Sequence, residues 1–208
     1  MTSENKAIPT LPNESNIHPV KFVAINTVPL IVGTTVASLI FQVGSTEQYQ
    51  STIDIIATHD AGWLYLGLLI FGRTIWFLNF STTLKYKMGV KGNLRTNTYF
   101  YKVIGKNAPE DVLVVLEEDG VLGQFNRSNR SVHNMMEAFG GFVASLVAVG
   151  IVFPFPTFVC VCIFCLGRIL HQTGLRKGFG AHVKGFLIST FGIVIVEGMV
   201  AVVAMKSL

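Results

Sequence analysis

Four polar residues are spaced so that they would share one face of a helix, directly before a long apolar stretch. They are Arg127, Arg130, Asn134 and Glu137. Their intervals of three, four and three residues bring side chains onto one stripe of an α-helix. Such a stripe can hold a zwitterionic ligand, because arginine forks match carboxylates and a glutamate matches an ammonium group. The alternative is a basic helix start that marks a membrane interface, with Glu137 offsetting Arg130 or a neighbouring helix.

The composition indicates that this stripe lies beside a membrane. Of the 208 residues, 50% are hydrophobic and only 13% are charged, and the mean hydropathy is +0.54, whereas soluble domains carry about 25% charged residues. An integral, multi-pass membrane protein is therefore expected. Cys160, Cys162 and Cys165 lie together in one apolar run, which indicates packing residues and disfavours a disulfide scaffold or a metal site.

Five apolar runs have the length of transmembrane helices, since about 20 residues cross a bilayer and the strands of membrane barrels are half as long. They are Phe22–Val43, Trp63–Phe80, Ala138–Phe153, Phe155–Leu170 and Gly185–Ala204. The predicted fold is therefore all-α, with one additional N-terminal transmembrane helix at 22–43 and a four-helix membrane domain over 63–204. Pro154 and Pro156 separate the third and fourth runs, where one proline can end a helix and the other can begin the next.

The distribution of lysine and arginine orients these spans. If the N-terminal tail, residues 1–21, is cytosolic, thirteen of these residues lie in connections on the cytosolic side and only Lys206 lies on the other side. Cytosolic loops are enriched in lysine and arginine, so we expect five spans with the N-terminus inside. A cleaved targeting segment is the alternative interpretation of the first run.

The longest cytosolic connection, residues 85–125, is too mixed for a single helix. Its stretch Asn97–Lys102 interleaves lysine with aromatic residues, a pattern that could contact nucleic acid. Beside a membrane, an interfacial segment that contacts anionic lipid is favoured. We therefore predict membrane lipid as a partner and no nucleic acid.

Two charged residues fall inside the predicted spans. Glu197 lies 12 residues into the last run, and Arg73 lies ten residues into the second run, which crosses in the opposite direction. A charged group at the bilayer centre costs about 2.5–3.5 kcal/mol on insertion scales. An Arg73–Glu197 ion pair inside the bundle is the simplest expectation, because a proton pathway would need further acids or histidines at that depth.

Three motifs together resemble those of the MAPEG superfamily, the membrane-associated proteins of eicosanoid and glutathione metabolism. The polar stripe reads R-x-x-R-x-x-x-N-x-x-E and looks like the signature of that family. The segment Gly167–Gly174 resembles its G-R-x-x-H/Y-x-x-A/G motif, and Asn107–Asp111 is similar to its N-P-E-D-like loop. The order and spacing of these motifs resemble the family's four-helix core, which leaves the run at 22–43 as an addition.

The resemblance implies a homotrimer in the endoplasmic reticulum or another organelle membrane. It also implies that glutathione binds as a co-substrate between neighbouring subunits, near the cytosolic side. Carried over by position, the implied contacts are Arg130, Asn134 and Glu137, with Arg127 in support, and Arg168 and His171 from the fourth run.

Two positions differ from the pattern of catalytic relatives. Lys184 stands where those relatives have an arginine that activates the glutathione thiolate, and Leu175 stands where they have a tyrosine. Lysine keeps the positive charge that lowers the pKa of a thiol, whereas leucine donates no hydrogen bond. His182 is a second candidate for the catalytic group. The resemblance therefore implies a glutathione transferase or peroxidase acting on a hydrophobic acceptor, and the alternative is a non-catalytic subunit of a larger, hetero-oligomeric membrane assembly.

Overall fold

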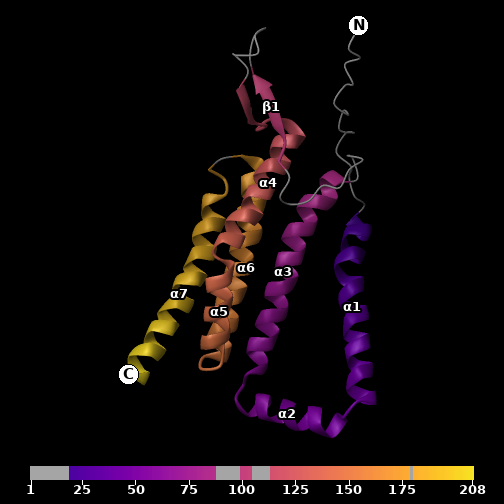
Figure 1. The fold of residues 1–208 in the computed structure, drawn as a ribbon, viewed down its shortest axis with the longest axis vertical. Helices are drawn as coiled ribbons and strands as arrows, with labels where there is room; N and C mark the ends of the chain where they lie inside the picture. Colours follow the sequence, from indigo (N-terminus) through magenta and orange to yellow (C-terminus); the bar gives the residue numbers. More distant parts are fainter. Residues whose placement is uncertain (1–18, 88–98, 105–112, 179) are drawn as a thin grey trace.

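The computed structural model describes residues 19–87, 99–104, 113–178 and 180–208, and it shows a bundle of long helices (Figure 1). Four of its helices are each long and apolar enough to cross a membrane. They are α1 (Pro19–Val43), α3 (Gly62–Lys87), α6 (Pro154–Lys177) and α7 (Val183–Ser207). The predicted all-α membrane fold is confirmed.

The remaining span is broken into two helices. Helix α4 (Gly120–Glu137) meets α5 (Phe139–Gly150) at an angle of 49°, and the two together are long and apolar enough to cross a membrane. Helix α5 has 12 residues and is therefore about 18 Å long, short of the roughly 30 Å of a bilayer core. The prediction of a self-contained span over Ala138–Phe153 is wrong, because part of this span lies in α4, whose buried face is largely polar.

The turn between α5 and α6 is short and lies before both prolines. The backbone N–H groups of Val152 and Phe153 donate to the Val149 carbonyl at 3.0 and 2.7 Å. Pro154 begins α6, and Pro156 follows in the same first turn, where a proline costs no helical hydrogen bond. The expectation that one proline ends the third span is therefore wrong, while the tight hairpin itself is present.

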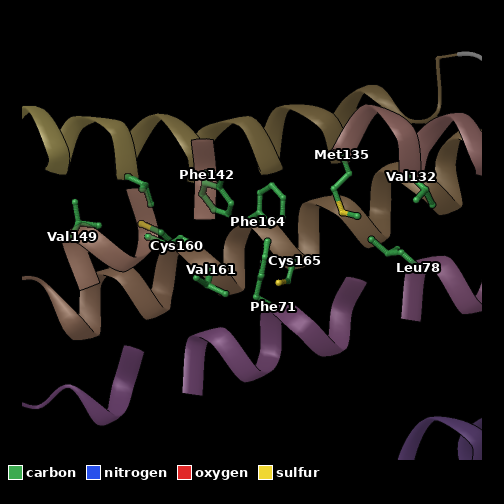
Figure 2. Close-up of a cluster of buried hydrophobic side chains, with 12 residues drawn as sticks. Phe71, Leu78, Val132, Met135, Phe142, Val149, Cys160, Val161, Phe164 and Cys165 are labelled. Carbon is green, nitrogen blue, oxygen red and sulfur yellow. The ribbon is translucent and has the colours of Figure 1, made fainter. Parts of the chain in front are cut away.

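The hydrophobic core lies where α3, α4, α5, α6 and α7 meet. Side chains from α3, α4, α5 and α6 point toward one another there (Figure 2). The rings of Phe71, Phe142 and Phe164 form its centre, with centroids 4.4 to 5.8 Å apart. Cys160 and Cys165 are buried free thiols in the same core. Packing is thus the observed role of these two cysteines.

Helix α6 packs most extensively against α7, and glycine makes this close approach possible. A Cβ atom on Gly185 of α7 would lie 2.1 Å from the His171 backbone nitrogen, and one on Gly167 of α6 would lie 2.3 Å from the Ser189 nitrogen. Small residues of this kind let membrane helices bring their backbones together. The spacing between α6 and α7 is therefore set by backbone contact.

Helix α2 (Thr46–Thr58) joins α1 to α3 and lies across their ends (Figure 1). One face carries Tyr49, Ile53 and Ile56, and the opposite face carries Glu47 and Asp54, which suits a helix in the plane of a membrane surface. This helix was not predicted from the sequence. Its amphipathic pattern could have indicated it, but the run is too short and too polar to register as a span.

The expected Arg73–Glu197 ion pair is not formed between these two described residues. Arg73 on α3 donates a hydrogen bond to the Asn26 carbonyl of α1, and Glu197 is exposed on α7. Helix α6 packs against both α3 and α7 and so stands between the two charges. The prediction of a pair inside one bundle is wrong for this reason.

Candidate functional site

A small hairpin caps the end of α4 that leads away from the bundle (Figure 1). Strands β1 (Tyr101–Ile104) and β2 (Leu113–Leu116) pair antiparallel, with Tyr101 opposite Leu116 and Ile104 opposite Leu113. This hairpin occupies the connection predicted at 85–125. The loop sequence Asn107–Asp111, which resembles the family's loop, lies outside the described residues.

Asn126 fastens this hairpin to α4. Its side chain accepts a hydrogen bond from the Phe100 backbone N–H at 2.9 Å and donates to the Phe100 and Glu117 carbonyls at 2.8 Å each. The Phe125 ring packs edge-on against the Phe100 ring, with centroids 5.4 Å apart. The start of α4 and the hairpin therefore form one unit.

Charged groups reinforce the base of the hairpin. The Lys102 ammonium lies 2.7 Å from the Asp119 carboxylate and 3.2 Å from the Glu117 carboxylate. The Asp119 backbone N–H and Lys102 lower the pKa of Glu117, and Lys102 lowers the pKa of Asp119. This lysine of the Asn97–Lys102 stretch thus has two carboxylate partners within the chain.

A cavity of about 530 Å³ lies between the hairpin and one face of α4. Its walls are Tyr99, Tyr101 and Leu116 on the hairpin side, and Arg130, His133, Asn134 and Glu137 on the helix side. Three residues of the sequence motif are therefore brought together on one surface. This cavity is the candidate functional site.

Four lining residues were not predicted as site residues, namely Tyr99, Tyr101, Leu116 and His133. The Tyr99 hydroxyl lies 2.9 Å from Nδ1 of His133 in a hydrogen bond, and the two rings meet edge-to-face with centroids 5.5 Å apart. Partial burial raises the pKa of the Tyr99 phenol, and the Arg130 charge opposes that rise. Tyr99 is therefore a neutral phenol at physiological pH and can act as a hydrogen-bond donor.

A buried polar layer supports the cavity from below. Arg168 of α6 donates from Nη1 and Nη2 to the Asn134 Oδ1 at 3.2 and 3.3 Å, and from Nη2 to the Ser131 carbonyl at 3.2 Å. The Ser131 hydroxyl lies 2.9 Å from Nδ1 of His171. Arg168 and His171, both predicted as site residues, do not line the cavity. Arg168 instead fixes the orientation of the Asn134 amide, which does.

Arg127 shares the helical stripe of Arg130 and Asn134, but it does not line the cavity. Its Nε donates to the Leu175 carbonyl and its Nη2 to the Arg176 carbonyl, each at 3.1 Å, and its Nη1 donates to the Glu118 carbonyl. A cation at the last carbonyls of a helix is favourable. The structure therefore places Arg127 at the end of α6 and not in the cavity.

The two predicted catalytic residues lie near the start of α7. Lys184 is exposed there, and the half-buried His182 ring meets the His171 ring edge-on, with centroids 5.4 Å apart. Neither residue is part of the cavity lining. The side chain of Leu175 is buried and offers no polar group.

Comparison with protein families decides the membership of the chain. The model of the MAPEG family matches residues 64–205, which is well over half of the sequence. The chain belongs to the MAPEG family. A search among curated proteins gives no match. The MAPEG match begins in α3 and ends in α7, so it includes both strands and the whole cavity, and it leaves α1 and α2 outside.

The MAPEG signature alone could have indicated His133 but not Tyr99. His133 follows Arg130 by three residues on the same helix and therefore shares its face. Tyr99 comes from the hairpin, and its approach to α4 depends on the fold of a connection whose sequence predicts no regular structure.

Proposed function

We propose that the cavity between the hairpin and α4 binds glutathione as the co-substrate of a membrane transferase or peroxidase. The observation that supports this best is the grouping of Arg130, Asn134 and Glu137 on one cavity wall in a member of the MAPEG family. Ligand pockets have volumes of about 300–1,000 Å³, and this cavity of about 530 Å³ falls within that range.

The charged groups of the cavity complement two of the three charged groups of glutathione. Glutathione carries two carboxylates and one ammonium; Arg130 supplies a guanidinium for a carboxylate, and Glu137 supplies a carboxylate for the ammonium. Asn134 offers an amide held in place by Arg168, and Tyr99 offers a phenol. A fixed amide loses little entropy on binding, which favours affinity.

We infer that the active unit is a homotrimer whose subunits complete one another's sites. At neutral pH only a few per cent of a thiol with a pKa near 8.5 is ionised, so a transferase needs a cation beside the glutathione sulfur. Lys184, with His182 beside it, would supply that cation from a neighbouring subunit, because neither lines the cavity of its own chain. A hydrophobic acceptor would enter from the lipid of the endoplasmic reticulum or another organelle membrane.

Isothermal titration of the full chain in nanodiscs tests glutathione binding. Removing an arginine or a glutamate that pairs with a ligand charge costs about 1.5–3 kcal/mol, or roughly 10- to 150-fold in affinity. We expect that loss in Arg130→Ala and in Glu137→Ala. Lys177→Ala is the matched control, because it removes an exposed cation of α6 and should leave the affinity unchanged. No heat of binding at millimolar glutathione would refute the proposal.

The second candidate is a non-catalytic subunit of a larger membrane assembly. The buried Leu175 side chain favours it, since the position implied for a hydrogen-bonding tyrosine has no polar atom. In that case the cavity would bind glutathione, or a molecule with similar charges, without activating a thiol.

A further inference from the structure

Arg73 and Glu197 lie on opposite sides of α6 within one chain. Helix α3 carries Arg73 and helix α7 carries Glu197, with α6 packed between these helices. In Figure 1 the same order is visible, with α3 and α7 on either side of α5 and α6. Neither residue reaches the other within its own subunit.

The two charges nevertheless lie at the same depth in the membrane. Arg73 is 11 residues from the start of α3 at Gly62, and Glu197 is ten residues from the end of α7 at Ser207. At 1.5 Å per residue these distances are about 16 and 15 Å. Both of these helix ends lie on the same side of the bundle (Figure 1).

Each charge also has room for a partner. Arg73 lines a cavity of about 380 Å³ whose walls come from α3, Leu30 of α1 and Ile169 of α6. Among the described residues, its guanidinium has one hydrogen bond, to the Asn26 carbonyl, and it lies 6.0 Å from the Trp76 ring. Glu197 is exposed on α7, and within the described residues it has no hydrogen bond or ion pair.

We propose that copies of this chain associate in the membrane so that Glu197 of one subunit enters the Arg73 cavity of the next. An unpaired charge in a bilayer is costly, and a second copy supplies the opposite charge. Rotation about the membrane normal keeps both residues at one depth, and contacts between different faces of identical subunits close into a ring. The pairing rests on the homotrimer of the proposed function and specifies one of its contacts, but it does not depend on glutathione binding.

Disulfide cross-linking distinguishes this pairing from the alternatives. With Arg73→Cys and Glu197→Cys in one chain, oxidation in native membranes should give a ladder of covalent dimers and higher species, because each bond joins two subunits. Each single variant should give no ladder. A monomer without a ladder would overturn the proposal, whether or not it contains an internal disulfide.

A matched pair controls for random collisions. Phe191 is 59% exposed on α7 and lies about 9 Å along the helix from Glu197, so Arg73→Cys with Phe191→Cys should cross-link weakly. A ladder of equal intensity from this control would count against a specific contact.

Charge reversal provides a test that needs no cysteine. In native mass spectrometry, Arg73→Glu and Glu197→Arg should each weaken association on the order of 30-fold or more. The double variant Arg73→Glu/Glu197→Arg should restore the oligomer. An oligomer that persists in both single variants, or a wild type that is monomeric or associates only with another protein, would refute the proposal.

Discussion

Replacing Asn126 by alanine should release the hairpin from α4. The Asn126 side chain is 1% exposed and makes three hydrogen bonds, two to Phe100 and one to Glu117, at 2.8 to 2.9 Å. A hydrogen bond contributes about 0.5–1.5 kcal/mol net, so three contribute about 3 kcal/mol. That free energy corresponds to an increase on the order of 100-fold in the opening equilibrium of the hairpin.

Hydrogen–deuterium exchange of the protein in nanodiscs measures this opening at the strands. We expect the amides of Tyr101–Ile104 and Leu113–Leu116 to exchange faster by the same factor in Asn126→Ala. Ser128→Ala is the matched control, since Ser128 is fully buried on α4 and its hydroxyl has no hydrogen-bond partner among the described residues. Unchanged exchange in Asn126→Ala, or equal acceleration in Ser128→Ala, would refute the role given to the asparagine.

Two further predictions concern catalysis and helix packing. If the protein activates glutathione, addition of glutathione should produce a thiolate absorbance that disappears in Lys184→Met. The absorbance should persist in Lys177→Met, which removes an equal charge nearby. A wild type that binds glutathione but shows neither thiolate nor turnover of chlorodinitrobenzene would establish the non-catalytic alternative. Gly185→Ala places a Cβ 2.1 Å from the His171 backbone nitrogen and should lower the free energy of unfolding by about 1–3 kcal/mol. The Cβ of Gly198→Ala meets no atom within 4 Å, so this variant should raise the free energy of unfolding by up to about 1 kcal/mol. Equal thermal stability of these two variants would contradict the close packing of α6 and α7.

A span could be predicted from the sequence where both its buried residues and its lipid-facing residues are apolar. Helices α6 and α7 are of this kind, and hydropathy finds them. Helix α4 could not be recognised as part of a span, because its buried face carries Asn126, Ser128 and Asn129, and these count as polar whether or not the fold buries them.

The site was predictable in part, because one helix carries most of it. Helical spacing alone places Arg130, Asn134 and Glu137 together. The same spacing suggested that Arg127 joins them, but the position of α6 determines what its guanidinium contacts. The contribution of Tyr99 depends on a hairpin, and hairpin contacts depend on tertiary structure.

The failed Arg73–Glu197 prediction has a similar cause. Depth along a helix follows from residue counting, and the two residues do lie at matching depths. The flank on which each charge lies follows only from the packing order of the helices, which the sequence does not reveal.

Native mass spectrometry of the full chain with millimolar glutathione tests most directly whether the cavity is a glutathione site. We predict one bound glutathione per chain in the wild type, and none in the double variant Arg130→Ala/Glu137→Ala under the same conditions. A wild type without bound glutathione, or a double variant with the same occupancy as the wild type, would contradict glutathione binding at this cavity.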